Sequence, residues 1–92
     1  MKADQELKEL GTRLKRERIA SELKQTDLAA RAALSFHTVA AAERGQPVTT
    51  ESLARILAAL GYDGALVNLL PEPSLSPLDL RKLKGKERER VR

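Results

Sequence analysis

The basic side chains of this chain are unevenly distributed, and their positions indicate a polyanionic partner. Residues 1–77 contain ten Lys or Arg and ten Asp or Glu, so their formal charges cancel. Residues 78–92 contain seven basic and three acidic residues and therefore carry the whole net charge of +4. A second concentration lies at residues 13–18, where four of the six side chains are basic. Such clusters suit nucleic acid or a similar polyanion, although a solvated helix face has the same composition.

The residue types that carry catalysis are scarce. His37 is the only histidine, and the chain contains no cysteine. One histidine cannot supply a catalytic triad or a metal site of several histidines, and without thiols there is neither a disulfide frame nor a thiolate zinc site. The sequence also contains no glycine-rich loop of the kind that cradles phosphate groups. We therefore predict no enzymatic activity, no metal and no cofactor.

Leu and Ala supply most of the apolar residues, which predicts an all-α fold. Hydrophobic residues make up 41% of the 92 residues, yet the chain has only one Phe and one Tyr. This composition favours closely packed helices over a β-sandwich, and the length allows one hydrophobic core. The N-terminus lacks the apolar stretch of a signal peptide, and no apolar run approaches the length of a membrane span. We expect a cytoplasmic protein with no membrane partner.

Apolar spacing and capping residues predict five short helices. Gly11 falls inside the first of them and predicts a start or a bend at that position. Pro71 ends the last helix, and "PEPSLSP" then indicates an extended spacer of polyproline character. We predict a helical domain over residues 4–70, a Pro-rich spacer over 71–77, and a basic tail over 78–92 that is a short helix or disordered. The five helices are expected at residues 4–23, 25–33, 35–44, 50–60 and 65–70.

Whether residues 25–45, "QTDLAARAALSFHTVAAAERG", form one helix or two decides the interpretation of the chain. The stretch contains no glycine or proline before its last residue. A single helix, however, would place Ser35 in its interior and would leave Leu34 and Val39 off its apolar line. A break after Ala33 restores an apolar side to each half, with Ser35 as the N-cap of the second helix. We therefore predict two helices joined by a tight turn.

This two-helix unit resembles the helix-turn-helix of the Cro/repressor class (XRE-type) of phage and bacterial transcriptional regulators. "LKQTDLAARAALSFHTVAAAERG" is similar to the Gln-x-x-Leu-Ala, Ser-x-x-Thr-hydrophobic and Glu-x-Gly pattern of that class, and "LARILAALG" is similar to its following helix. The resemblance covers about residues 10–70 and implies a compact five-helix, lambda-repressor-like DNA-binding domain. Ala33 stands where the class usually has a turn glycine. We expect strain or a slightly different turn there, because a left-handed conformation costs such a residue roughly 1–2 kcal/mol.

The resemblance implies that the second helix of the unit enters the major groove of a double-stranded operator. Phe36, His37 and Ala41 fall at the base-reading positions, where the two apolar side chains can contact a thymine methyl and His37 can bond a purine. Gln25 is expected to hold a phosphate with nearby backbone N–H groups. Simpler roles stay open, namely an exposed helix start for Gln25, a cap for Ser35 and a solvent-exposed ring for His37. Further DNA contacts are expected from Thr26, Ser35, Thr38, Arg44, Gln46, Thr49 and Thr50.

Arg18 and Glu43 match a buried ion pair that ties the first helix to the third in proteins of this class. The alternative is that they are two unrelated surface charges. If they are paired, removing one partner would cost several kcal/mol, because the other charge would stay buried alone. Arg13, Lys15 and Arg16 are expected on a solvated helix face rather than at the DNA.

The size of the domain and the character of the C-terminal segment point to partners. A monomer of this size makes few DNA contacts, so we expect a homodimeric repressor that reads two half-sites. The segment "DGALVNLL", residues 63–70, is the expected dimer surface. "LLPEPSLSPLDLRKLKGKERERVR" resembles the C-terminal part of DNA-binding antitoxins of HipBA-type toxin–antitoxin modules, which implies repression of its own operon and binding of a kinase-like toxin. A disordered solubilising end and a source of non-specific phosphate contacts are the other interpretations of this tail.

A protein-interaction module that keeps the helix-turn-helix frame without binding DNA is the alternative function. The base-reading positions favour it because they are poor in hydrogen-bonding groups. The segment "GQPVTTE", residues 45–51, also favours it, since it contains no Lys or Arg. If the protein does bind DNA, sequence-dependent DNA shape and the spacing of the dimer must contribute much of the specificity.

Overall fold

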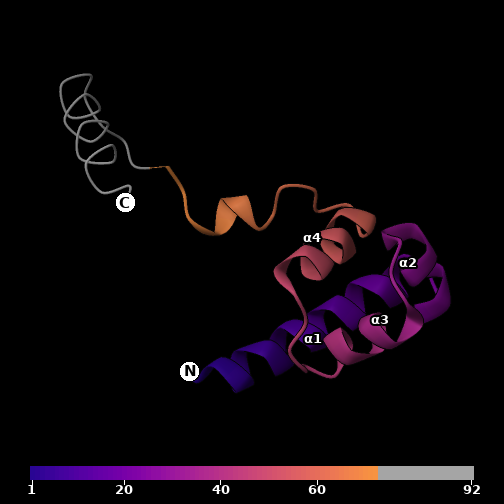
Figure 1. Ribbon diagram of the computed structural model, residues 1–92, viewed down its shortest axis with the longest axis horizontal. Coiled ribbons are helices and arrows are strands. Elements are labelled where there is room, and N and C mark those ends of the chain that lie inside the picture. Colours follow the sequence, from indigo (N-terminus) through magenta and orange to yellow (C-terminus); the bar gives the residue numbers. More distant parts are fainter. Residues whose placement is uncertain (73–92) are drawn as a thin grey trace, which may run out of the picture.

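Four α-helices and one turn of 3₁₀ helix form residues 1–72, the part of the chain that the structure, a computed structural model, describes. No β-strand occurs between residues 1 and 72, which confirms the predicted all-helical fold class. The predicted tail at 78–92, and the predicted spacer apart from its first two residues, lie outside the described residues. In chain order the elements are α1 (Ala3–Ala20), α2 (Gln25–Ala32), α3 (Phe36–Glu43), α4 (Thr50–Ala59) and the 3₁₀ turn η1 (Val67–Leu69) (Figure 1).

The long helix α1 packs against α3 through a glycine. Of the two predictions at Gly11, a start or a bend of the helix, the start is wrong, because α1 continues through this residue from Ala3 to Ala20, close to the expected range of 4–23. Gly11 is buried, and a Cβ at this position would lie 2.6 Å from the carbonyl oxygens of Ala42 and Glu43. The absence of a side chain therefore lets α1 approach the end of α3 closely. The packing gained in this way outweighs the low helix propensity of glycine.

The predicted break between the two central helices is confirmed. α2 ends one residue before Ala33, which adopts a left-handed conformation with φ 57° and ψ 44°. The N–H of Leu34 donates to the carbonyl of Ala29 at 2.9 Å and so satisfies a carbonyl group at the end of α2. Ser35 is the N-cap of α3, and its Oγ accepts from the N–H of Thr38 at 3.2 Å. The chain therefore turns on an alanine where the resemblance leads us to expect a glycine.

A glycine and a threonine define the connection from α3 to α4. Gly45 has φ 79°, and a Cβ on it would lie 2.6 Å from the Cα of Lys8 in α1. Both the backbone conformation and the lack of space therefore require glycine here. Thr49 is the N-cap of α4, and its Oγ1 accepts from the N–H of Ser52 at 3.0 Å. Thr50 is the first residue of α4.

The core lies where the four α-helices meet. Leu28, Val39 and Ile56, one each from α2, α3 and α4, are the largest side chains that are fully buried. Leu14 joins them from α1, and small alanines fill the space between the helices. This packing holds helices of only eight to ten residues, which would be unstable in isolation. None of the helices within residues 1–72 is long and apolar enough to cross a membrane.

The fifth helix predicted at residues 65–70 is not an α-helix. The chain forms only one 3₁₀ turn there, and Val67, Leu69 and Leu70 are 79%, 70% and 84% exposed. A segment of six residues needs tertiary packing to hold an α-helix, and these exposed side chains gain almost none. Gly64, with φ 81°, precedes the segment and Pro71 follows it, so an α-helix could not extend beyond either end.

Candidate nucleic-acid interface

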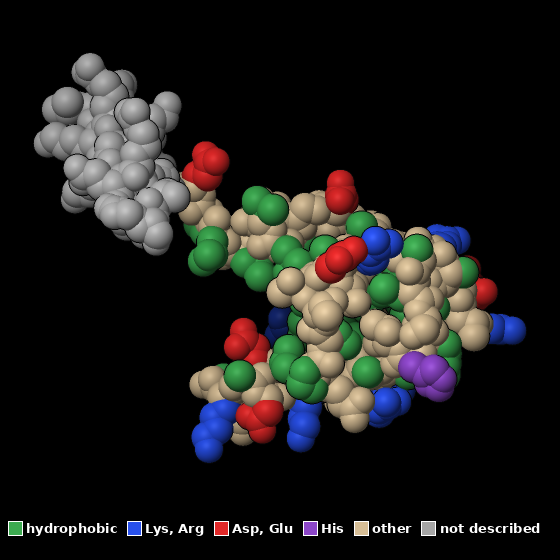
Figure 2. Space-filling view, in the orientation of Figure 1, with side chains coloured by type: hydrophobic (Ala, Val, Ile, Leu, Met, Phe, Trp, Pro, Cys, Tyr) green, Lys and Arg blue, Asp and Glu red, His purple; other side chains and the backbone are tan. Residues whose placement is uncertain are grey.

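The three predicted base-reading residues of α3 are all at least partly exposed, and two of them lie on the side that faces away from the core. Val39 and Ala42 are buried in the core, whereas His37 and Ala41 lie one turn apart on the opposite side. His37 is exposed, Ala41 is partly exposed, and Phe36 at the first position of α3 is 43% exposed. Figure 2 shows the histidine side chain, in purple, on the surface of the molecule. A large partner can therefore reach this side of the helix.

The two exposed rings at the start of α3 contact each other. The ring centroids of Phe36 and His37 are 5.6 Å apart, and the rings meet edge to face at 69°. Such a contact is favourable and restricts the rotamers of both side chains. One ring offers only apolar contacts, and the other adds ring nitrogens that can donate or accept a hydrogen bond. The pair is therefore a partly ordered surface on which apolar and polar recognition lie side by side.

Two hydroxyl groups lie at the N-terminus of α3. The Oγ of Ser35 accepts from the backbone N–H of Thr38, and the two side-chain oxygens are 3.0 Å apart. Ser35 therefore acts as a cap, which is the simpler role that its sequence position left open. It is also exposed, at the positive end of the helix dipole. Phosphate groups bind at such helix ends, so the cap role does not exclude a contact with DNA.

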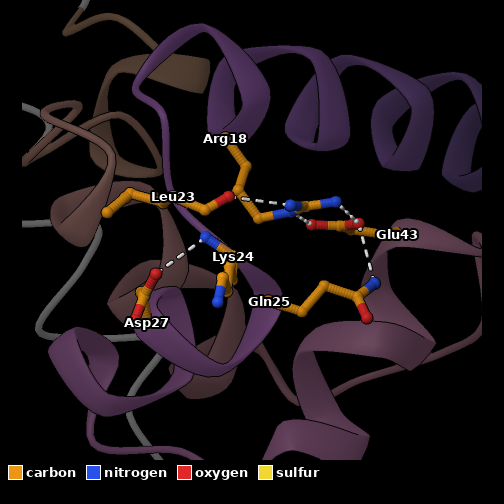
Figure 3. A network of polar contacts seen from close by, with 6 residues as sticks. All are labelled: Arg18, Leu23, Lys24, Gln25, Asp27 and Glu43. Carbon is orange, nitrogen blue, oxygen red and sulfur yellow. Dashed lines mark hydrogen bonds and ion pairs between the residues drawn. The ribbon is translucent and has the colours of Figure 1, made fainter.

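Arg18 and Glu43, the pair implied by the resemblance, are in contact in the structure. The Nε of Arg18 donates to Oε2 of Glu43 at 2.6 Å, and Nη2 donates to Oε1 at 3.1 Å (Figure 3). The two side chains are only 11% and 4% exposed. Nη1 donates to the carbonyl oxygen of Leu23 at 2.8 Å, so the same guanidinium group also holds the connection between α1 and α2. The ion pair therefore ties α1 to the end of α3, and the same guanidinium group fixes the start of the path to α2.

Gln25 is bound to the same carboxylate. Its Nε2 donates to Oε1 of Glu43 at 3.0 Å, and the residue is partly exposed (Figure 3). Sequence reasoning placed Gln25 at a phosphate and missed this bond, because nothing local marks a contact between residues eighteen positions apart. An amide nitrogen carries two N–H groups. One of them serves Glu43, and the second can still be offered to a ligand.

The remaining predicted contact residues are exposed and lie after α3 or in the first turn of α2. Arg44 and Gln46 follow α3, and the Nη2 of Arg44 donates to the Oε1 of Gln46 at 3.1 Å. Thr49 and Thr50 are at the start of α4, and Thr26 is in the first turn of α2. Within residues 1–72, no side-chain hydrogen bond joins these residues to the three on the outer side of α3. They are therefore polar groups separate from the three predicted base-reading residues.

A comparison with known protein families decides the family. The family described as helix-turn-helix domain matches residues 9–70, which is more than half of the chain. The chain belongs to the helix-turn-helix domain family. In this helix-turn-helix domain, α2, the left-handed turn at Ala33 and α3 form the motif. The motif places its second helix in the major groove, so the general class of the protein is a DNA-binding regulator. No curated protein matches the chain significantly.

Proposed function

We propose that this helix-turn-helix protein is a sequence-specific repressor that binds a double-stranded operator as a homodimer. The observation that carries the proposal is the exposed side of α3 with Phe36, His37 and Ala41, since a helix sealed inside the core could not enter a groove. In this arrangement α3 lies in the major groove and α2 crosses the sugar–phosphate backbone. Because the partner is DNA, we infer a cytoplasmic location and a binding role without catalysis.

Polar groups on both sides of α3 support a phosphate-binding role. The hydroxyls of Ser35 and Thr38 lie at its N-terminus, and Arg44 follows its last residue. Gln25 is positioned by Glu43 and is expected to offer its second amide N–H to a phosphate. Phosphate contacts orient a protein on the duplex, whereas contacts with base edges determine sequence preference. These residues would therefore orient α3, and the residues on its outer side would select the sequence.

Selection of bound sequences from random duplex DNA tests the proposal. Wild type, His37→Ala and the control Thr12→Ala are compared at one salt concentration, since Thr12 is exposed on α1. We expect an enriched motif with two-fold symmetry for the wild type and the control. The His37→Ala variant should lose preference at specific positions of that motif, because one good base contact contributes about 1–3 kcal/mol. A wild type that enriches no motif would contradict the proposal.

The surface around η1 supports the dimeric state. Beside the exposed apolar residues of this segment, a hollow of about 500 Å³ lies between α1, α4 and the chain after α4. Green side chains follow this side of the molecule in Figure 2. Contact with a second copy would cover this apolar surface and set two α3 helices against two half-sites. The apolar side chains that line the hollow include Leu10, Leu53, Leu57, Leu66 and Leu69.

We further propose that the protein is the antitoxin of a toxin–antitoxin module, with its C-terminal tail binding a kinase-like toxin. The support is the sequence of the tail, whose residues 78–92 carry the net charge of +4. A chain truncated after Pro77 distinguishes the proposed roles of this tail. Loss of binding to a kinase-like toxin on truncation supports the antitoxin. Unchanged behaviour indicates a solubilising end, and a weaker salt dependence of DNA affinity indicates phosphate contacts.

A protein-interaction module without DNA binding is the second candidate function. The charge of the segment after α3 favours it, since no Lys or Arg lies between residues 45 and 51. The nearest following cation, Arg55, donates to Glu51 at 2.8 Å, which partly neutralises it. The two functions differ in the selection experiment, because an interaction module would enrich no DNA motif while remaining folded.

A further inference from the structure

The reading surface of α3 is unusual in the chemistry that it offers. Phe36 is 43% exposed, so its ring is partly covered by the protein and partly available to a partner. Ala41 adds a methyl group one turn after His37. Neither Phe36 nor Ala41 can form the paired hydrogen bonds by which Arg reads guanine or Asn and Gln read adenine. Apolar contact is therefore the main form of recognition that this surface supplies.

The major groove contains one apolar feature on its base edges, the methyl group on C5 of thymine. Cytosine presents no such group, but a methyl group added at its C5 atom lies at the same position in the groove. Burying one such group changes a binding constant about fourfold. A surface that reads methyl groups therefore responds to thymine and to 5-methylcytosine, but not to uracil or to unmodified cytosine.

We propose that Phe36 and Ala41 recognise the C5-methyl groups of pyrimidines, so that methylation of cytosine strengthens DNA binding by this protein. The inference rests on the proposed DNA-binding function. The edge-to-face contact with His37, at a centroid distance of 5.6 Å, limits the positions of the Phe36 ring before DNA is bound. His37 itself supplies the neighbouring hydrogen bond to a purine. The surface thus pairs one polar contact with one methyl contact.

Single-base replacement in the selected duplex tests this inference with the full chain. Each thymine is replaced by uracil, which removes only the methyl group. Each thymine–adenine pair is also exchanged for cytosine–guanine and for 5-methylcytosine–guanine, which differ from each other only in the methyl group. Affinity is measured by fluorescence anisotropy at one salt concentration. In each half-site we expect at least one thymine whose replacement by uracil weakens binding about fourfold. At that same position, cytosine should bind more weakly than 5-methylcytosine by a similar factor.

Two variants assign the effect to the ring. Phe36→Ser should bind the duplex but distinguish thymine from uracil much less than the wild type does, and circular dichroism checks that it is folded. The control Thr12→Ala should keep the full discrimination. A wild type that binds the duplex with the same affinity after every methyl removal overturns the inference and leaves the proposed function standing. A full thymine preference in folded Phe36→Ser overturns the assignment to this ring. If no duplex is selected at all, both proposals fall.

Discussion

At the scale of single residues, the ion pair between Arg18 and Glu43 connects stability with the DNA-binding surface. It joins α1 to the end of α3, and the same carboxylate accepts from Gln25 at 3.0 Å. A buried charge that loses its partner keeps its desolvation cost without compensation. The pair therefore determines both where α3 lies and how an amide at the expected phosphate site is oriented.

Glu43→Gln is expected to lower the free energy of unfolding by about 3–5 kcal/mol, because Arg18 would stay buried beside a neutral amide. Urea titration followed by circular dichroism measures the change. Glu9→Gln, in the exposed pair with Arg13, is the matched control and should cost less than about 1 kcal/mol. The double variant Arg18→Met, Glu43→Leu should recover much of the loss, since it leaves no charge unpaired. Equal stability of Glu43→Gln and Glu9→Gln would contradict this assignment.

Ala33→Gly is expected to stabilise the protein by up to about 1 kcal/mol. The left-handed conformation at φ 57° costs alanine roughly 1–2 kcal/mol, which exceeds the entropic cost of about 0.5–1 kcal/mol that glycine adds. Ala30→Gly makes the same substitution at an exposed position inside α2 and should destabilise by about 1 kcal/mol. The two variants should therefore shift the urea midpoint in opposite directions. If both variants lowered the urea midpoint, Ala33 would not adopt the left-handed conformation of the turn.

At the scale of helices, the distance between α1 and α3 depends on one residue. Gly11→Ala normally stabilises a helix by about 1 kcal/mol. Here the new Cβ would lie 2.6 Å from two backbone carbonyl oxygens, which cannot move aside as a flexible side chain can. We expect a net loss of about 1–3 kcal/mol in urea titration. Thr12→Ala, at the exposed neighbouring position, should stay within about 0.5 kcal/mol of wild type. A more stable Gly11→Ala variant would mean that the helices are further apart.

The segment after α4 meets α1 at Tyr62 and Glu17, which line the same hollow of about 220 Å³. The hydrogen bond with Glu17 raises the pKa of Tyr62 above its ordinary value of 10.0, and the negative charge of that carboxylate adds to the effect. Because the protonated phenol is the favoured form in the folded state, this contribution to stability is present below pH 10 and is lost as the pH rises through the raised pKa.

Tyr62 is the only tyrosine, so ultraviolet titration of tyrosinate reports this group alone. We expect a pKa above 10.0 for the wild type and a return toward 10.0 in Glu17→Gln. An unchanged pKa of Tyr62 in Glu17→Gln would mean that the chain after α4 does not contact α1 at these two residues. The control Glu22→Gln removes an exposed carboxylate from the same region of the sequence and should leave the titration unchanged.

At the scale of the whole molecule, the exposed apolar segment near η1 should determine the oligomeric state. Leu69→Asp places a charge in the surface proposed to pair, where Leu69 is 70% exposed in the single chain. We expect light scattering to show a shift from dimer to monomer and DNA affinity to fall with it, because one half-site is lost. The control Asn68→Asp adds the same charge at an exposed neighbouring residue, and this variant should form the dimer as the wild type does. A Leu69→Asp variant that stays dimeric would exclude this surface.

Local signals in the sequence determined the positions of the helices and the break between α2 and α3. Each signal acts within about one helical turn: Ser35 caps α3 through Thr38, and Gly45 ends it with a positive φ. The break could therefore be predicted although the turn residue is an alanine. The exposed side of α3 follows equally from the sequence, since burial of Val39 and Ala42 leaves His37 facing outward.

Contacts between distant residues were decided only by the tertiary structure. The sequence indicated a helix start or a bend at Gly11, because the feature that requires glycine there, the backbone of α3, is distant along the chain. The bond from Gln25 to Glu43 exists because α2 and α3 cross, and no spacing in one segment encodes that crossing. The fifth helix is missing among residues 1–72 because a short apolar segment needs a surface to pack on. Short-range hydrogen bonds and apolar periodicity depend on neighbouring residues, so the sequence alone predicts them. The close approach of two helices and the burial of a side chain depend on residues distant in the sequence, so only the tertiary structure decides them.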